Sequence, residues 1–516
     1  MRRRKGSRRR SLPLKFPLLV FGLILLVAGL VYVFARQERA RRVVVNGNGT
    51  ITVKAGGDVQ AALDRASPGD TILLAAGATF RGSLKLPNKS GNAYITIRTS
   101  APDNQIPAPG ERLDPSRYGN VLPKLMSDTV GVPAVTATGG AHHYRFIAVE
   151  FGPTPKGEGN IIAIGTTEEK SLNELPHDIE LDRVYIHGSP VDGQRRGVAL
   201  NGRQIRIVNS YISDIKRKGD ESQAIAGWGG DGPFEIVNNY LEAAGEGVLF
   251  GGAEGALKVV PSNIVVRDNH FNKQLQWRSE GWLVKNQFEL KNARHVKVDN
   301  NLMTNNWAKG QNGTAVLFTV RDDSGSVATI EDVEFTNNIV RGAGGAINIT
   351  GYEAKGGRRL LIRNNIFEDI NGEKWGGDGQ FMTITAWNGL VVENNTILQT
   401  GSITKAYDNP ITGFVFRNNI VAQNAYGFHG SDHAPGQDSL DTFFPSSVVS
   451  NNAIIGGEAR LYRGRNVYQL SFHQLKFVNP ESGDYRLRAD SPLKRAGTNG
   501  ADIGATLDPL NVGKSR

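Results

Sequence analysis

Two short stretches of the sequence carry charged residues of types that could remove a proton from a substrate. Glu289 and Lys291 alternate with apolar residues in FELK, and Arg321 ends the stretch FTVR. A lysine acts as a general base when burial or a neighbouring cation lowers its pKa, and an arginine binds carboxylates. This combination is suited to taking the proton next to the carboxylate of an acidic sugar while neutralising that carboxylate.

The alternation predicts two strands whose charged side chains face outward. Successive side chains of a strand point to opposite faces, so Glu289 and Lys291 share one face, as do Thr319 and Arg321. If the strands lie side by side, we expect Lys291 directly below Arg321 and Glu289 below Thr319. Two such cations about 5 Å apart repel by roughly 3 kcal/mol at an effective dielectric of about 20. They would either join a surface network with Glu289 and Asp322 or bind an anionic sugar.

Aromatic and amide residues in the same part of the chain are candidates for sugar contacts. All six tryptophans fall between residues 228 and 387. Flat apolar rings stack on sugar faces, although such rings also pack inside loops. The predicted substrate-binding residues are Trp228, Trp282, Trp307, Trp387 and Asn348.

Two alternatives to elimination remain open. A glycoside hydrolase needs two carboxylates roughly 5–9 Å apart, and Glu246, Glu289 and Asp322 could provide such a pair. A non-catalytic surface protein could use the same fold as a stiff scaffold. The sequence contains no motif that selects among these functions.

A repeated pattern defines the elements that must position these residues. Alternating apolar residues, a pair ending in asparagine and a second apolar pair recur in IVNNYL, VRDNHF, VDNNLM, FTNNIV, IRNNIF, VENNTI, FRNNIV and VSNNAI. The second residue of each pair falls at 239, 269, 301, 338, 365, 395, 419 and 452, so the period is 24 to 37 residues. A period this long and variable is typical of solenoid coils with loops of different lengths.

The pattern predicts an all-β, right-handed parallel β-helix over residues 51–506. Asparagine suits a sharp bend between strands because it tolerates the left-handed conformation. Stacked coils would also place equivalent asparagines about 4.8 Å apart, close enough to form a ladder of hydrogen bonds. A short amphipathic helix near Asp58–Ala66 would plug the first coil. A Greek-key sandwich would not repeat one turn at one phase.

The two ends of this region carry a resemblance. The opening ITVKAGGDVQAALDRASPGDTILLAAGATFRGSLKL and the closing FVNPESGDYRLRADSPLKRAGTNGADIGA resemble the ends of bacterial members of the pectate-lyase-like β-helix superfamily. The charged pair resembles the site of β-helix alginate and chondroitin lyases. That resemblance implies a polysaccharide lyase with Lys291 as base, Arg321 as its arginine, and Glu289 and Asp322 as Ca²⁺ ligands. Asn292 and Asp323 depart from that family's pattern, in which serine follows the lysine and histidine and glycine follow the arginine.

The amino-terminal segment has the pattern of a membrane anchor. Residues 16–34 form an uncharged run that could cross a hydrocarbon core of roughly 30 Å, and the heavier positive charge precedes it. We expect a basic cytoplasmic tail at 1–15, a transmembrane signal-anchor at 16–35, a linker at 36–50 and a C-terminal tail at 507–516. A cleaved signal peptide is the alternative. Either way, the body would lie outside the cytoplasm.

Charge and cysteine content exclude further classes. The formal net charge is +10, but residues 1–42 carry +11, which leaves the remainder at −1. A nucleic-acid partner is therefore not expected, because the basic residues gather beside the membrane segment. The chain has no cysteine, so disulfides and thiolate chemistry are excluded. We expect a monomer whose partners are a polysaccharide and the cytoplasmic membrane.

Overall fold

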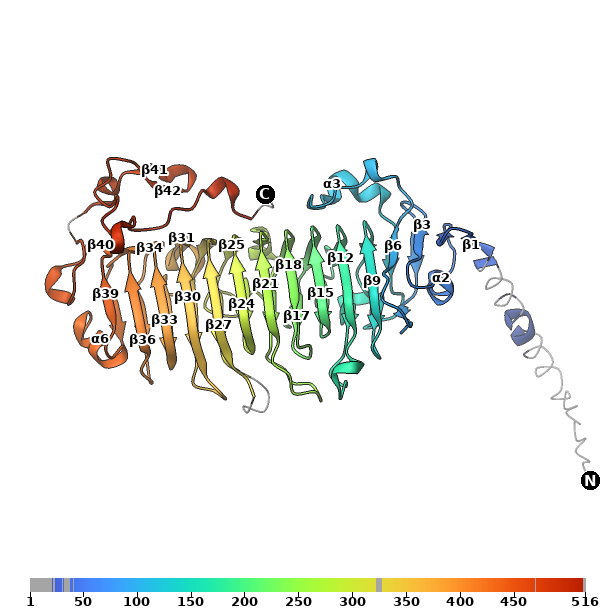
Figure 1. Ribbon diagram of the computed structural model, residues 1–516, viewed down its shortest axis with the longest axis horizontal. Helices are drawn as coiled ribbons and strands as arrows, with labels where there is room; N and C mark the ends of the chain where they lie inside the picture. Colours follow the sequence, from blue (N-terminus) through green and yellow to red (C-terminus); the bar gives the residue numbers. More distant parts are fainter. Residues whose placement is uncertain are drawn as a thin grey trace, which may run out of the picture.

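The computed structural model describes residues 21, 24–29, 31, 38–39, 41–321, 327–468 and 470–513. Three long sheets of parallel strands, named A, B and C here, wind around a common axis (Figure 1). From β9 onward each coil contributes one strand to each sheet in turn. The predicted parallel β-helix is therefore confirmed.

The strands of each sheet follow one another along the solenoid. Sheet A consists of β1 (Val43–Asn46), β2 (Thr50–Val53), β3 (Thr71–Leu74), β6 (Ile95–Thr99), β9 (His142–Ile147), β12 (His177–Asp182), β15 (Arg203–Val208), β18 (Phe234–Val237), β21 (Ser262–Arg267), β24 (Ala293–Asp299), β27 (Ile330–Thr336), β30 (Gly357–Arg363), β33 (Trp387–Glu393), β36 (Thr412–Arg417) and β39 (Val448–Ser450). Sheet B consists of β4 (Thr79–Arg81), β7 (Lys124–Met126), β10 (Glu150–Phe151), β13 (Tyr185–His187), β16 (Tyr211–Ile215), β19 (Tyr240–Ala243), β22 (His270–Asn272), β25 (Leu302–Asn306), β28 (Ile339–Ala343), β31 (Ile366–Ile370), β34 (Thr396–Gln399), β37 (Ile420–Ala422) and β40 (Ala453–Ile455). Sheet C consists of β5 (Leu84–Leu86), β8 (Val135–Ala137), β11 (Asn160–Ile164), β14 (Arg196–Leu200), β17 (Gln223–Gly227), β20 (Glu246–Phe250), β23 (Phe288–Leu290), β26 (Thr314–Thr319), β29 (Gly345–Thr350), β32 (Met382–Thr385), β35 (Thr404–Ala406) and β38 (Phe428–Gly430).

Helices and one hairpin occupy the ends and the loops. The α-helices are α2 (Val59–Arg65), α3 (Pro115–Tyr118), α4 (Trp277–Glu280), α5 (Gly372–Trp375) and α6 (Gln437–Phe443). The 3-10 turns are η1 (Asp103–Gln105), η2 (Gly119–Val121), η3 (Pro155–Gly157), η4 (Leu172–Glu174), η5 (Ala459–Leu461), η6 (Phe472–Leu475), η7 (Pro480–Ser482), η8 (Thr498–Gly500) and η9 (Pro509–Asn511). The hairpin pairs β41 (Phe477–Asn479) with β42 (Asp484–Leu487).

The repeated pair forms the bend between sheets A and B. In each of the eight copies the first residue of the pair has a φ between 55° and 59°. This left-handed conformation turns the chain within two residues, and asparagine and aspartate adopt it at low cost. The bend is therefore made by the residue type that the repeat supplies.

The second asparagine of each pair is fully buried and forms the expected ladder. Its side-chain amide donates to the next asparagine Oδ1 at 2.9–3.1 Å, from Asn239 to Asn452. The same amide donates to a backbone carbonyl, as Asn365 does to Phe335 at 2.9 Å. Since buried polar groups are costly unless they are paired, the ladder fixes the stacking of coils.

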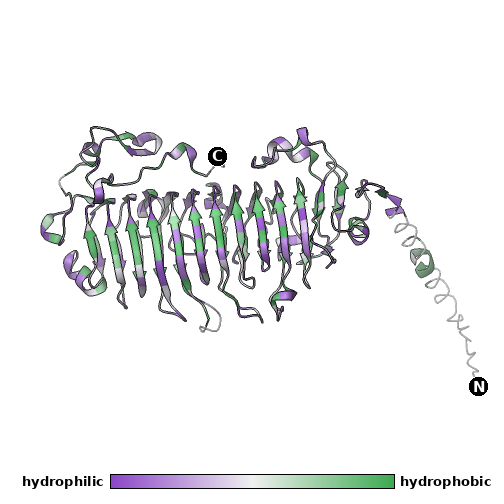
Figure 2. Ribbon diagram, viewed as in Figure 1, coloured by the Kyte–Doolittle hydropathy of each residue, from purple (hydrophilic) through white to green (hydrophobic). Residues whose placement is uncertain are grey.

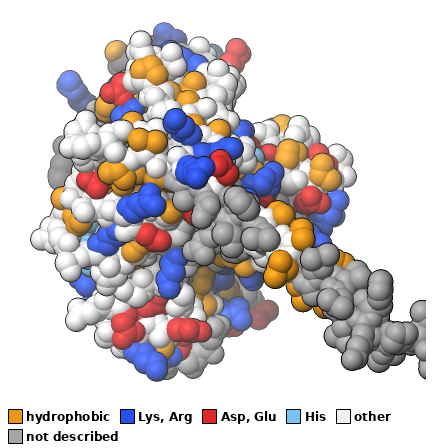
Figure 3. All heavy atoms as spheres, turned by 90° about the vertical axis from the view of Figure 1, so that its right-hand side faces the viewer, with side chains coloured by type: hydrophobic (Ala, Val, Ile, Leu, Met, Phe, Trp, Pro, Cys, Tyr) orange, Lys and Arg blue, Asp and Glu red, His pale blue; other side chains and the backbone are white. Residues whose placement is uncertain are grey.

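Apolar side chains fill the solenoid along its whole length. The inward residues of all three sheets belong to one continuous core cluster. Figure 2 shows hydrophobic residues concentrated along the strands and hydrophilic ones in the loops. Viewed from the amino-terminal end, the surface mixes basic, acidic and apolar side chains (Figure 3).

The amino-terminal part starts the solenoid earlier than expected. Strand β1 lies within the predicted linker and pairs antiparallel with β2. Helix α2 falls where a helix was expected, and Asp58 caps it by accepting from the Ala61 N–H at 3.0 Å. The predicted anchor at 16–35 lies largely outside the described residues. Within the described residues, no helix is long and apolar enough to cross a membrane.

Two segments outside the coils pack along the bend between sheets A and B. The proline-rich excursion at 101–123, which ends where β7 joins sheet B, donates from Arg112 to the carbonyls of Asn238 and Asp268. Arg112 also donates to the Gly513 carbonyl at 2.7 Å, so the predicted C-terminal tail meets the excursion. Residues that follow β40 cover the outer face of sheet B, with Ile366 beneath them (Figure 1). Sheet C is the sheet on which the predicted site lies.

Candidate functional site

Glu289 and Lys291 lie on the outer side of sheet C, in β23 and just after it. Glu289 sits between Leu249 of β20 and Leu317 of β26, and only 2% of it is exposed. Lys291 Nζ lies 3.5 Å from Glu289 Oε1, and 16% of the lysine side chain is exposed. The two residues form an ion pair in which Lys291 is the partner that reaches solvent.

The predicted stacking of Glu289 with Thr319 is wrong. The register of β23 and β26 places Glu289 opposite Leu317. Alternation leaves this register open because a shift of two residues keeps every side chain on its own face. Arg321 is exposed, and its backbone N–H donates to the Lys291 carbonyl at 2.9 Å. The two residues therefore adjoin through the backbone, at the end of β26.

The remaining predicted residues of this group lie farther along the sheet or outside it. Asn348 in β29 is half-buried and faces Leu317, so it is two coils away from Glu289. Asp322 lies outside the described residues.

Two glycines of the preceding coil make room for Lys291. Gly251 and Gly252 have φ values of 88° and 83°. A Cβ on Gly252 would lie 2.6 Å from Lys291 Cδ, and a Cβ on Gly251 would lie 2.4 Å from the Asn292 nitrogen. Glycine is required at both positions, because only glycine allows this conformation and this approach. The lysine stem therefore lies directly against the backbone of the coil before it.

A row of buried and half-buried polar residues runs across sheet C toward this pair. It occupies equivalent outward positions in β11, β14, β17 and β20. Arg196 donates to Asn160 Oδ1 and to Gln223 Oε1, both at 3.0 Å, and Gln223 donates to Glu246 Oε2 at 3.0 Å. We call Asn160, Arg196, Gln223, Glu246 and Lys285 the polar row. Burial, together with the neighbouring Arg195, lowers the pKa of Arg196 to about 10.

Lys285 closes the polar row by bridging two carboxylates. Its Nζ lies 2.6 Å from Glu246 Oε1 and 2.6 Å from Glu221 Oε1. Burial lowers the pKa of Lys285, but the charge of Glu246 and its hydrogen bonds more than offset this and raise it. Burial raises the pKa of the fully buried Glu246, and the charge of Glu289 adds to that effect. The charge of Glu289 therefore raises the pKa of Glu246, whereas the charge of Lys285 lowers it.

Lys273 supports the row from below. It is fully buried, and its Nζ donates to three carbonyls of residues 243–245 at 2.7–2.9 Å and to the Asn286 carbonyl at 3.1 Å. Burial lowers its pKa to about 7, with Glu246 acting in the opposite direction. Lys273 therefore ties β19–β20 to the loop that carries Lys285 and Asn286.

The contacts of Glu289 do not fit the Ca²⁺ ligand that the resemblance implies. One of its oxygens faces Lys291, and the other accepts from Asn286 Nδ2 at 3.1 Å. Ca²⁺ takes six to eight oxygen ligands, whereas these neighbours are donors. The partly exposed Lys291 amine can bind an anion and can exchange a proton.

Comparisons with known proteins agree with this architecture. The sequence matches no model of a protein family and no curated protein. Among solved structures, the PL6 family alginate lyase AlyGC matches with a TM-score of 0.50 at 16% identity, over 90% of this chain and 58% of that one. This chain thus spans less than two thirds of that lyase. The PL6 family lyase Pedsa3628 from Pseudopedobacter saltans (TM-score 0.40, 10% identity) covers 89% of this chain and 99% of its own, and pectate lyase Pel9A (TM-score 0.32, 14% identity) covers 87% and 91%. The match to AlyGC agrees with the parallel β-helix fold described above.

The tryptophans predicted to bind sugar are mostly buried. Trp387 is 2% exposed and belongs to the central core. Trp282 and Trp307 are each 4% exposed and form a separate cluster with Trp277 and Trp375. These three predicted rings cannot offer a face to a sugar in this structure.

Trp228 is the exception among the predicted rings. It is half-buried, and the Arg196 guanidinium lies 4.8 Å from its ring centroid. The ring therefore packs against the polar row.

Sequence reasoning missed most of the polar row. Glu246 was considered only as a hydrolase carboxylate, and Arg196, Gln223 and Lys285 were not singled out. Each comes from a different coil, so no local spacing connects them. Polar residues at the same outward position of successive strands were the available signal, but reading it requires the register.

Proposed function

We propose that the β-helix binds and cleaves an acidic polysaccharide by β-elimination on the outer side of sheet C. The observation that carries this proposal is the Lys291–Glu289 pair, in which a partly exposed amine is held in a glycine cradle over a buried carboxylate. The fold shared with an alginate lyase supports the substrate class. The fold alone does not decide the chemistry, because unrelated activities occur on one fold.

Each residue has a definable part in the reaction. The neutral Lys291 amine takes the proton from the sugar carbon next to the carboxylate, while Arg321 neutralises that carboxylate. The electrons of the broken C–H bond form a carbon–carbon double bond, and the glycosidic C–O bond breaks. The departing sugar oxygen takes a proton from water. Glu289 pairs with the Lys291 ammonium that this proton transfer creates.

The test is an assay for the unsaturated sugar end that elimination creates. The full-length chain is incubated with pectate, alginate and glycosaminoglycans, and ultraviolet absorbance is followed with added Ca²⁺ and with a chelator. Lys291→Ala should lower the rate at least about 100-fold, the usual contribution of a positioned base. Lys291→Arg keeps the charge but not the base, so it should retain polymer binding and lose cleavage. Lys405→Ala, an exposed lysine four coils along sheet C, should have no effect.

The alternatives predict different outcomes. New reducing ends without ultraviolet absorbance would indicate a hydrolase. Within the described residues a hydrolase is disfavoured, because Glu246 is fully buried and paired with Lys285. Absence of both cleavage and binding would favour the scaffold function. Activity that depends on Ca²⁺ would require a set of oxygen ligands other than the Glu289 arrangement described above.

We also propose that residues 16–35 anchor the chain in the cytoplasmic membrane, with a monomeric body outside and α2 closing the first coil. The apolar run and its flanking positive charge support this orientation. Cell fractionation and sequencing of the mature amino terminus test it. A soluble product that begins after residue 34 would identify a signal peptide instead.

A further inference from the structure

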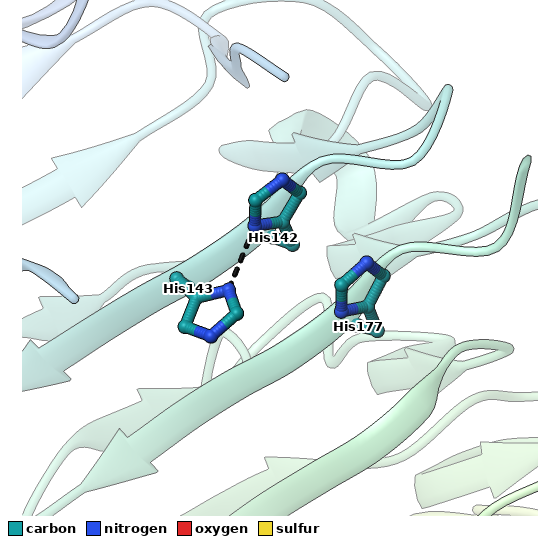
Figure 4. Close-up of side chains that lie close together, drawn as sticks. All are labelled: His142, His143 and His177. Carbon is teal, nitrogen blue, oxygen red and sulfur yellow. Dashed lines mark hydrogen bonds between the residues drawn. The ribbon is translucent and has the colours of Figure 1, made fainter. Parts of the chain in front are cut away.

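Three histidines meet on sheet A, on a different sheet from the proposed polysaccharide site. His142 and His143 begin β9, and His177 begins β12. All three are half-buried. One ring nitrogen from each histidine lies within 4.8 Å of the corresponding nitrogens of the other two. Figure 4 shows the three rings gathered at the start of the two neighbouring strands.

The register and one unusual backbone conformation bring the rings together. His142 pairs with His177 across the strands, and their rings stack with centroids 4.7 Å apart. Consecutive strand residues normally point to opposite faces. The φ of 58° at His143 interrupts this alternation, and its Nδ1 lies 2.7 Å from His142 Nδ1 (Figure 4). Such a gathering needs both the pairing and the left-handed conformation of His143.

The surroundings favour a neutral His142 and hold His177 in one orientation. Burial lowers the pKa of His142, and the neighbouring His177 and His143 add to this effect. His177 Nδ1 lies 2.7 Å from Asp178 Oδ2, and Gln204 donates to the other Asp178 oxygen at 3.2 Å. When His177 donates from Nδ1 to this carboxylate, its Nε2 is left free as a ligand. A carboxylate behind a histidine is the usual outer partner of a metal-binding imidazole.

We propose that His142, His143 and His177 bind a divalent transition-metal ion of the Zn²⁺ type, with Asp178 as a positioning residue. Imidazole nitrogens suit Zn²⁺ and its neighbours, whereas Ca²⁺ prefers oxygen ligands. Tetrahedral zinc with Zn–N bonds of about 2.05 Å needs ligand nitrogens about 3.3 Å apart. Small ring rotations reach that spacing from the distances observed here. Three protein ligands leave one coordination position open to water or to a substrate group.

The experiment titrates Zn²⁺ alone into full-length protein that has been freed of metal by a chelator. Calorimetry should show one saturable ion per chain, and Co²⁺ in its place should give the visible absorption of a tetrahedral site. His142→Ala, His143→Asn and His177→Ala should each weaken Zn²⁺ binding by more than about 100-fold, and Asp178→Asn by about 10- to 100-fold. Asparagine at 143 tolerates the left-handed backbone, so this variant keeps the local conformation.

His295→Ala is the matched control. His295 occupies the same position of β24, with a φ of 53°, and its ring nitrogen lies 3.6 Å from Asp332. This variant should bind Zn²⁺ as the unmodified chain does. Circular dichroism without metal shows which variants fold. If an alanine variant does not fold, the Zn²⁺ affinities of His143→Asn and Asp178→Asn still test the proposal. Absence of saturable binding to the unmodified chain, or unchanged binding in the folded triad variants, would overturn the proposal.

Discussion

Two rows of stacked polar side chains run along the solenoid, and they differ in how regularly they repeat. The asparagine ladder uses one uncharged residue type in every coil from Asn239 to Asn452, and each amide finds the same partners. The polar row on sheet C uses a different residue in every coil, and it contains charges. A regular ladder stabilises stacking wherever it occurs. An irregular, buried charged row costs desolvation energy, which suggests that it is retained for what it positions.

The largest expected loss of stability comes from breaking the polar row at Lys285. Lys285→Met removes the ammonium that lies 2.6 Å from Glu246 and leaves a fully buried carboxyl without its partner. Removing one partner of a buried ion pair typically costs about 3–5 kcal/mol. Denaturant unfolding measures this loss, and Lys405→Met on the exposed side of β35 should cost under about 0.5 kcal/mol. Equal losses of unfolding free energy in the two variants would contradict a buried ion pair between Lys285 and Glu246.

Breaking the ladder should cost somewhat less. Asn365→Ala leaves the Phe335 carbonyl and the Asn338 N–H without the partners they have at 2.9 and 2.8 Å. Each unpaired buried group costs about 1–3 kcal/mol, so we expect a loss of about 3 kcal/mol. Asn388→Ala is the control, since that asparagine is exposed. Equal tolerance at both positions would remove the stabilising role of the ladder.

The ladder could be predicted from the sequence, and the polar row could not. Both outcomes depend on whether a repeated residue marks the register of the coils. Repetition makes the register visible, because each asparagine pair marks the same point of a coil. Glu289 and Lys291 were assigned to the correct face by alternation, but their neighbours were not, since alternation is unchanged by a shift of two residues. Lys285 comes from a loop, where no periodicity applies. The histidine triad depends on a positive φ at His143, which no residue pattern near it indicates.

The two rows should also differ in their response to pH. Lys273 lies beneath the polar row, and burial lowers its pKa to about 7. An unfolded lysine titrates near 10.4, so between pH 7 and 10 the unfolded chain binds more protons and stability rises with pH. From pH 7 to pH 9 this amounts to roughly 2 kcal/mol.

Unfolding curves at several pH values measure this slope. The slope should be absent in Lys273→Met and preserved in Asn365→Ala, which removes no titratable group. A Lys273→Met curve parallel to that of the unmodified chain would show that the buried lysine keeps its proton throughout this range.

The smallest expected change in stability tests the role of the Lys291–Glu289 pair in function. Gly252→Ala places a Cβ 2.6 Å from Lys291 Cδ at a φ of 83°, so the lysine stem must move. Gly281→Ala introduces the same type of strain at a φ of 79°, but its Cβ meets no atom within 4 Å. Both variants should lose about 1–2 kcal/mol from the left-handed backbone. Only Gly252→Ala should also lower the rate of polysaccharide cleavage, because it displaces Lys291 from its position over Glu289. If both variants cleave equally well, then the glycine cradle serves packing alone and the reacting group lies elsewhere on the solenoid.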